Sequence, residues 1–576
     1  MRRDCFPAYR SFFTVGWLCL LVACTAPIRP PAVTRSVPHD DLAEAKQLAQ
    51  QAAGESGPER SALGWSRCAA AAYRAADTDD EIKGHEAVTL GTTCTDKLLD
   101  YLLSTEPQHW HSTTIDLAGA PLTVELRGIS PSLSGPIRLT LADRVNLPRS
   151  MGPRFASPGF GVALVAASAR CSDRPICKVY PVEGIFRPAT AWIESGERGQ
   201  LRLVVSDPLA HPIVVIGFHT YPLAMDISAP AAMLVESSRL NRLAVWNLLG
   251  GKQIELRQGV YLLQDYDPNK TPIVMVHGLG ASPLIWARLT NQILGSPDLR
   301  ARYQIWQVIY QTNAPELVDR LRVQQFLDNA WSQLDPDGRD AARHGMVFIG
   351  HSMGGVVARL LTADSGDVLW DAAITVPFDQ VRGSERDRTL VHNVLDFKPY
   401  PGVGKAIFLA SPHLGSPLSD DFIGRLARRI VTPHGPEPDA LRRIVDANPS
   451  TVQSDLLMDY RKEGISSIST LSTNQPVSHA AQALMPAKGI RYYTIAGNLP
   501  GASVPGDGVV PLASAILAGA MSTIIVTSGH KVYNNDQAIA QIIKILREPP
   551  DECSTFVPPA TGQPSPDRQA NCIATQ

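Results

Sequence analysis

The most regular hydrophobic pattern lies between residues 266 and 548, where short apolar runs alternate with longer amphipathic segments. Runs such as Ile273-Val274-Met275-Val276 are apolar at every position, which is typical of strands buried on both faces. Their alternation with helices predicts a mostly parallel sheet with helices on both faces. The expected strands are 273–276, 305–310, 346–349, 405–410, 490–495 and 523–526, and the expected helices are 315–334, 353–364 and 536–546.

Two different patterns precede this region. Residues 40–111 have apolar positions at helical spacing, and we expect packed helices of which the first begins at Asp40-Asp41. Residues 112–265 instead alternate apolar and polar positions between Gly and Pro residues, which predicts an antiparallel β-sandwich-like domain. This β-rich region shows no catalytic constellation, so packing or substrate presentation is its expected role. Its clearest strands are 122–127, 137–141, 190–194, 201–205 and 213–216.

The N-terminus combines a basic start with an apolar run that ends at Ala23. The run is too short for a membrane span of about 20 residues and fits a signal peptide. Its end, Leu21-Val22-Ala23-Cys24, resembles the lipobox of bacterial lipoproteins, in which the cysteine is acylated after cleavage. The resemblance implies that residues 1–23 are removed and that residues 24–39 form an anchor and stalk. Lipidated Cys24 would attach the protein to a membrane. Thr25 in place of Asp favours the outer membrane, on its periplasmic or surface face; the alternative is an ordinary signal with a chance cysteine.

The composition agrees with a globular protein of two to four domains, since the chain has 576 residues and 44% of them are hydrophobic. A formal net charge of −2 gives no general reason to bind nucleic acid. Export and acylation would leave six of the nine cysteines, an even number that suggests disulfides, although many connectivities remain open. No Cys/His cluster suggests a metal. The pairs nearest in sequence are Cys68/Cys94, Cys171/Cys177 and Cys553/Cys572, the last within a Pro-rich tail over 549–576.

A candidate nucleophile follows the predicted strand 346–349. Gly350-His351-Ser352-Met353-Gly354 has the Gly-x-Ser-x-Gly pattern between a strand and a helix. In this context the pattern predicts a sharp turn that presents Ser352, with glycines where side chains would clash. The N-terminus of the following helix favours developing negative charge.

A second motif, His277-Gly278-Leu279-Gly280, closes the first strand of the series. Together the two motifs resemble the α/β-hydrolase family, specifically lipases of the His-Gly type. The resemblance implies that an oxyanion hole is formed by the backbone amides of Leu279 and Met353. The sequence around His277 and Asp507 also resembles a branch that contains deacylases of glycosylated inositol lipids.

The same resemblance implies an acid and a base after the serine, in the order Ser, Asp, His. Asp507, in Gly506-Asp507-Gly508-Val509-Val510-Pro511, follows the strand 490–495, and His530 follows the strand 523–526. In this assignment His530 takes the proton of Ser352 and Asp507 holds the imidazole. The competing residues are weaker: two acids fall early in an insertion, and four histidines lie in turns or in the insertion, namely Asp420, Asp421, His277, His351, His413 and His479.

Residues 415–488 separate two core strands by far more than a usual connection, and the family carries a cap insertion here. A cap would shield an apolar acyl pocket, although a surface decoration without gating is the alternative. The sequence therefore predicts a membrane-anchored serine hydrolase that cleaves carboxylic esters, lipid acyl esters in particular, without a metal or organic cofactor. The open alternatives are a non-catalytic envelope lipoprotein that uses the fold for binding, and an acyltransferase, thioesterase or peptidase on the same triad.

Overall fold

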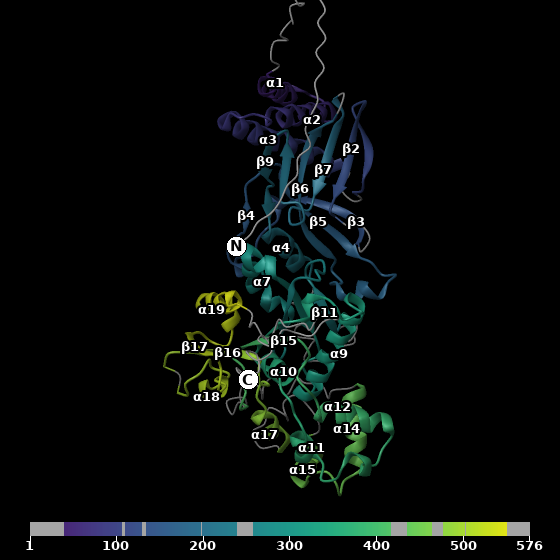
Figure 1. Ribbon diagram of the computed structural model, residues 1–576, viewed down its shortest axis with the longest axis vertical. Coiled ribbons are helices and arrows are strands. Elements are labelled where there is room, and N and C mark those ends of the chain that lie inside the picture. Colours follow the sequence, from purple (N-terminus) through teal and green to yellow (C-terminus); the bar gives the residue numbers. More distant parts are fainter. Residues whose placement is uncertain are drawn as a thin grey trace, which may run out of the picture. The chain divides into compact units, whose positions relative to one another are not determined.

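The computed structural model describes residues 40–105, 110–129, 134–196, 199–238, 257–415, 435–463, 476–501 and 503–549. The predictions for Cys24, the stalk, Cys553, Cys572 and most of the tail lie outside these residues. Figure 1 shows the chain with its elements labelled. Among the described helices, none combines the length and the apolar character that a membrane crossing requires.

A seven-stranded sheet forms the centre of the C-terminal half, in the order β11-β13-β12-β14-β15-β16-β17. All neighbouring pairs are parallel except β11 and β13, which are antiparallel. The predicted parallel sheet is confirmed, and each predicted strand matches one observed strand. The strands are β11 (Gly259–Leu262), β12 (Thr271–Val276), β13 (Tyr303–Ile309), β14 (Met346–His351), β15 (Val403–Leu409), β16 (Arg491–Asn498) and β17 (Ser522–Thr527).

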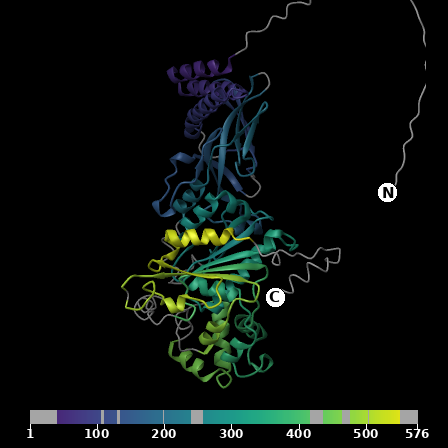
Figure 2. The same cartoon turned by 60° about the vertical axis from the view of Figure 1, so that its left-hand side comes forward.

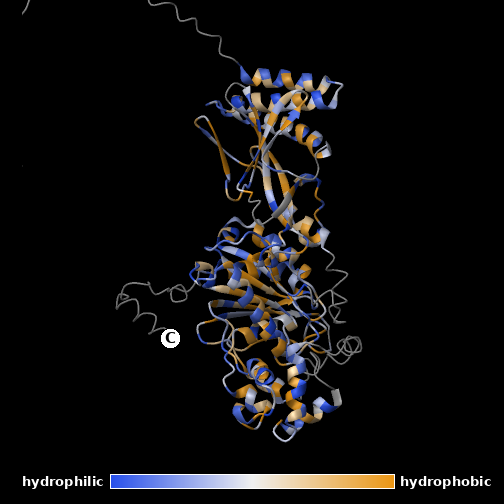
Figure 3. Cartoon of the chain, turned by 90° about the vertical axis from the view of Figure 1, so that its right-hand side faces the viewer, coloured by the Kyte–Doolittle hydropathy of each residue, from blue (hydrophilic) through white to orange (hydrophobic). Residues whose placement is uncertain are grey.

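Helices cover both faces of this sheet. Successive side chains of a strand point to opposite faces, so strands that are apolar throughout must be covered on both. Along β12, Ile273 and Met275 pack in one core with α7 (Ala287–Gly295) and α19 (Asp536–Arg547). Val274 and Val276 pack in the other core with α9 (Glu316–Leu334) and α10 (Met353–Leu361). Figure 2 shows α19 lying across one face of the sheet, and Figure 3 shows the hydrophobic character of the strands between the helices. Two short helices, α8 (Pro297–Arg302) and α18 (Leu512–Ala515), lie in the connections.

The strand β11 lies before residue 266, where the sequence pattern predicts the start of the hydrolase domain. The pattern up to residue 265 suggested a place in the β-rich region, but β11 pairs with β13 over four residues. Val260 and Leu262 belong to the same hydrophobic core as Trp306 and Val308. Asp265, just after this strand, forms a two-pronged ion pair with Arg187 at 2.5 and 2.6 Å. The edge of the sheet therefore begins before the predicted boundary.

The N-terminal region contains three helices on one face of a single six-stranded sheet. Cys68, Leu98 and Leu99 of the helices share a core with Leu122 and Val124 of the sheet. The predicted antiparallel β-rich region is confirmed, and the helices cover one face of its main sheet. The helices are α1 (Asp41–Gly54), α2 (Pro58–Ala75) and α3 (Glu81–Thr105).

The strands of this sheet run β1-β2-β7-β6-β5-β3, and only the β2–β7 pair is parallel. Two small sheets and α4 (Ser228–Ser237) lie in the same region. The strands are β1 (Thr113–Leu117), β2 (Ala120–Arg127), β3 (Ser134–Leu141), β5 (Val162–Arg170), β6 (Ile185–Ser195) and β7 (Leu201–Ser206). The small sheets pair β4 (Ala156–Ser157) with β10 (Met225–Asp226) and β8 (Ile213–Ile216) with β9 (His219–Pro222).

Two disulfides join the cysteines nearest in sequence. Cys68 of α2 is bonded to Cys94 of α3, and Cys171 is bonded to Cys177 in the loop after β5. The first bond ties two helices of the N-terminal region together. The pairing agrees with the proximity argument for these four residues.

The predicted cap is present in part as α14 (Pro436–Ala447), α15 (Ser454–Glu463) and α17 (Pro476–Ala483). It packs against two further helices, α11 (Val368–Ala373) and α12 (Glu385–Leu395), from the connection between α10 and β15. Arg443 of α14 donates to both carboxylate oxygens of Asp387 in α12, at 2.9 and 2.6 Å. The described cap therefore comes from two insertions, whereas the sequence predicted one.

Candidate active site

Ser352 occupies the turn between β14 and α10 with a backbone φ of 55° and ψ of −129°. Positive φ is uncommon for residues other than glycine and persists where the surroundings hold it. Two backbone hydrogen bonds do so here: the Ser352 amide donates to the Leu409 carbonyl, and the Gly355 amide donates to the Ser352 carbonyl, each at 2.9 Å. The turn therefore fixes the direction in which the hydroxyl points.

The glycines around Ser352 allow backbone segments to approach closely. A Cβ on Gly350 would lie 2.4 Å from the Gly354 carbonyl oxygen, and a Cβ on Gly354 would lie 2.3 Å from the Val276 carbonyl oxygen. Both contacts are with backbone, which cannot move aside as a flexible side chain would. The Gly-x-Ser-x-Gly spacing thus has a steric cause in this fold.

Asp507 and His530 meet Ser352 at the carboxyl ends of neighbouring strands. His530, after β17, places Nε2 3.0 Å from the Ser352 Oγ and Nδ1 2.8 Å from the Asp507 Oδ2. Asp507 follows β16 and is only 3% exposed. Three residues that are far apart in the sequence therefore form one continuous hydrogen-bonded chain.

The Asp507 carboxylate is held from its other side by backbone. Its Oδ1 accepts from the amides of Val509 and Val510 at 2.8 and 2.7 Å. A carboxylate only accepts, so the Nδ1 of His530 must carry the proton in that contact. The neutral imidazole then turns the lone pair of Nε2 toward Ser352, which is the tautomer that can take a proton from the hydroxyl.

The loop after β12 approaches the same turn from the other side. A Cβ on Gly278 would lie 2.8 Å from the Ser352 Cβ, so this position leaves room only for glycine. The Gly280 amide donates to the Thr312 Oγ1 at 3.1 Å, and the Ala281 amide donates to the Gly278 carbonyl at 3.1 Å. These bonds hold the short turn that contains Leu279.

A cavity of about 640 Å³ opens over these groups. Leu279 and Met353 line it together with Ser352, Asp507 and His530. Met353 is the first residue of α10, and the first amides of a helix have no partner within the helix. Most of the remaining wall is apolar or glycine, including Ala281, Pro412, Val509, Val510 and Tyr533.

Comparison with known proteins agrees with the fold. Residues 273–537 match the model of the alpha/beta hydrolase family. This part of the chain has the α/β-hydrolase fold, and we call it the hydrolase domain. No curated protein matches the chain by sequence.

Solved structures similar to the hydrolase domain include several esterases and lipases. A lipase from Bacillus licheniformis in its mature form is 18% identical, with a TM-score of 0.25, over 49% of this chain and 93% of that one. Lipase 1 from Pelosinus fermentans is 12% identical, with a TM-score of 0.29, over 49% of this chain and all of that one (100%). Because these TM-scores are below 0.5, the fold assignment depends on the sheet order and the family match.

Three of the four competing histidines do not line the cavity. His277 is fully buried, and its ring stacks on Tyr310 with centroids 4.7 Å apart. Burial lowers the pKa of His277 to about 4, so this ring stays neutral near pH 7. His413 is 1% exposed, and burial holds its pKa well below the usual range. His479 is exposed on α17, while Asp420 and Asp421 lie outside the described residues.

His351 has a structural role that its sequence position did not reveal. Its Nε2 donates to the backbone carbonyl of His530 at 2.8 Å. Burial, followed by the neighbouring His530, lowers the pKa of His351 to about 3. The neutral ring therefore connects the serine turn to the loop that carries His530. No sequence motif signals this contact, because it depends on how two loops meet.

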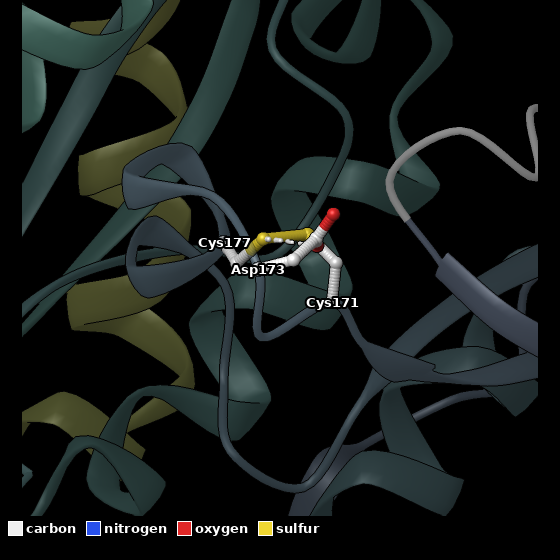
Figure 4. A group of neighbouring side chains, drawn as sticks. All are labelled: Cys171, Asp173 and Cys177. Carbon is white, nitrogen blue, oxygen red and sulfur yellow. Dashed lines mark hydrogen bonds between the residues drawn. A yellow bond between two sulfur atoms is a disulfide. The ribbon is translucent and has the colours of Figure 1, made fainter.

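One group in the described residues has the composition of a metal site, namely Cys171, Asp173 and Cys177. Figure 4 shows that the two sulfur atoms are joined in the disulfide. A sulfur in a disulfide is not a thiolate, the form of cysteine that binds metals. This group is therefore described as a disulfide loop, outside the hydrolase domain.

Proposed function

We propose that this protein is a serine hydrolase that cleaves carboxylic esters through Ser352, His530 and Asp507. The observation that carries the proposal is the hydrogen-bonded chain from Asp507 through His530 to Ser352, at 2.8 and 3.0 Å. A serine hydroxyl is a weak nucleophile until a base takes its proton. The chain supplies that base in the required tautomer.

The reaction follows from the positions of these groups. Ser352 Oγ attacks the ester carbonyl while Nε2 of His530 takes the hydroxyl proton. The oxyanion that forms is stabilised by the amides of Leu279 and Met353, and one such donor is worth about 10²–10³ in kcat. His530 then protonates the leaving alcohol, and water hydrolyses the acyl enzyme with His530 again as base. Asp507 stabilises the imidazolium in both halves of the reaction.

The proposed substrate is a lipid acyl ester, an acylated inositol lipid among the candidates. The cavity over Ser352 has a volume of about 640 Å³, within the range of about 300–1,000 Å³ that is usual for ligand pockets, and its largely apolar wall suits an acyl chain. We further propose that acylated Cys24 holds the protein in the bacterial envelope at the outer membrane. Thioesterase, acyltransferase or peptidase activity would use the same groups.

The activity is tested with purified protein and p-nitrophenyl esters of increasing acyl length. We expect Ser352→Ala to abolish turnover, while Ser332→Ala, an exposed serine on α9, leaves it unchanged. Equal background rates in the parent protein and Ser352→Ala would sink the enzyme proposal in favour of a binding role. Turnover of thioesters or amides above that of oxygen esters would redirect the substrate class.

A fluorophosphonate probe tests the base separately. We expect the probe to label Ser352 in the parent protein and to label it far more slowly after His530→Ala. His479→Ala is the matched control, because this histidine is exposed outside the cavity. Equal labelling of His530→Ala and the control would contradict the assigned base. Membrane partitioning that is unchanged in Cys24→Ser would contradict the proposed lipid anchor.

A further inference from the structure

An exposed apolar surface lies on the β8–β9 hairpin, outside the hydrolase domain. Ile213 pairs with Pro222 and Val215 pairs with Thr220, so these four side chains share one face. All four are exposed, with Ile213 at 50% and Val215 at 59%. Phe218, in the turn, is 100% exposed. We call these five residues the hairpin face.

The opposite side of the hairpin is packed into the fold. Val214 and Ile216 are buried in one cluster with Leu42, Phe160 and Trp192. The alternation means that the hairpin face cannot turn inward without exposing this cluster. The exposure of the hairpin face is therefore built into the register of the two strands.

The hairpin also lies close to the first residues that the structure describes. Leu42, in the first turn of α1, belongs to the cluster under the hairpin. The Tyr221 hydroxyl donates to the Ala76 carbonyl at 2.6 Å, and the Phe218 amide donates to Asp77 at 3.4 Å. Arg74, two residues before Ala76, donates to Asp41 at 2.9 Å. The start of α1 and the hairpin thus share one end of the N-terminal region.

The length of chain before α1 limits the distance to the anchor. Sixteen residues separate Cys24 from Asp41. Such a segment spans at most about 60 Å, even when fully extended. An acyl group on Cys24 would therefore keep Asp41 within that distance of the lipid surface, and the neighbouring hairpin at a high effective concentration near it.

From these observations we propose that the hairpin face inserts into the lipid surface that holds the acylated Cys24, a proposal that rests on the proposed anchor. Its five side chains are uncharged. The nearby carboxylates of Asp77 and Asp79 lie 3.8 and 3.6 Å from His219 Nε2. His219 pairs with Ile216 and belongs to the opposite side of the hairpin. Binding therefore depends on apolar contact and not on anionic lipids.

The test uses the full acylated chain in phosphatidylcholine vesicles, with Ser352→Ala to keep the lipid intact. Cys553 and Cys572 are changed to Ser, and Thr220→Cys carries an environment-sensitive fluorophore. We expect quenching by a nitroxide on the lipid acyl chain that does not change with salt. The matched control carries the label at Ser332→Cys on α9 and is expected to stay unquenched.

Replacing the apolar groups separates insertion from mere proximity. Phe218→Ser with Val215→Ser is expected to lower the quenching about tenfold, because a buried aromatic ring alone is worth more than a factor of ten. Ile525→Ser, with 47% exposure on β17, is the matched change elsewhere and is expected to have no effect. Absent quenching, quenching that survives the double change, or a Phe218-dependent dimer in ultracentrifugation would each overturn the proposal.

Failure of the anchor is distinguishable from failure of the hairpin. Mass spectrometry of the N-terminal peptide reports the acyl group directly. If Cys24 carries no acyl group, its thiol is coupled to a maleimide lipid, which restores the tether. The thiol of Thr220→Cys is protected during this step and receives the dye afterwards. Quenching in that sample supports the hairpin face although the natural anchor is absent, and no quenching overturns it.

Discussion

Replacing Asp507 by Asn tests the assigned tautomer of His530 with almost no change in shape. The Asn side chain can keep one oxygen toward the amides of Val509 and Val510, which now bond Oδ1 at 2.8 and 2.7 Å. The amide nitrogen then faces His530 where the carboxylate Oδ2 accepts at 2.8 Å. Two donors cannot face each other, so Nδ1 must give up its proton and Nε2 must carry it.

The consequence for catalysis is large and the consequence for stability is small. A protonated Nε2 points an N–H at Ser352 Oγ, 3.0 Å away, and cannot take the hydroxyl proton. A wrong tautomer of this kind costs about 10⁴ in kcat, or about 5.5 kcal/mol. The hydrogen bonds from the amides of Val509 and Val510 both survive, so the free energy of unfolding should change by about 1 kcal/mol at most.

The assay compares kcat and KM for a p-nitrophenyl ester with the thermal midpoint of unfolding. Asp507→Ala serves as the contrast, because it removes the side-chain acceptor of the buried Val510 amide, a loss of about 1–3 kcal/mol. We expect Asp507→Asn to lose kcat while it keeps its Tm and KM, and Asp507→Ala to lose both kcat and Tm. If Asp507→Asn kept more than a tenth of the parent kcat, the tautomer argument would be refuted.

Three further predictions concern stability. Gly354→Ala should prevent stable folding of the hydrolase domain, since its Cβ would lie 2.3 Å from a backbone carbonyl; a soluble, active Gly354→Ala protein would contradict this steric account. Cys68→Ser should lower the free energy of unfolding by about 3.5 kcal/mol, estimated from a loop of 26 residues, while ester turnover at 25 °C stays near the parent value. Acid should also destabilise the fold. Burial lowers the pKa of His277, His351 and His413, so the unfolded state binds more protons below about pH 6.5. Urea titrations should show a loss in the free energy of unfolding of about 1.4 kcal/mol per pH unit for each histidine. A free energy of unfolding that is unchanged between pH 7 and pH 4.5 would argue against neutral buried rings.

The strands and the serine turn of the hydrolase domain were predictable because their signals are local. A run such as Ile273–Val276 needs no partner to be read as a buried strand, and the glycines around Ser352 are required by contacts within one turn. Asp507 and His530 were different. Spacing alone does not single them out, and the resemblance to a family supplied their order along the chain.

Features that depend on distant partners escaped the sequence. Leu122 and Val124 alternate with polar residues in the manner of a sandwich strand, but the pattern shows only that one face is covered. Helices α2 and α3 cover it, and a period of two cannot distinguish a helix from a second sheet as the cover. The bond from His351 to the His530 carbonyl was equally invisible, since it joins residues 179 apart.

The position of β11 has a consequence for where the chain can be cut for expression. A shortened chain beginning at residue 266 would lack β11 and leave the unpaired edge of β13 open to other chains. It would also lose Val179, Tyr180 and Ile185, which share a hydrophobic core with Trp306 and Phe348. The two regions therefore do not behave as interchangeable modules. Such a fragment should aggregate on expression.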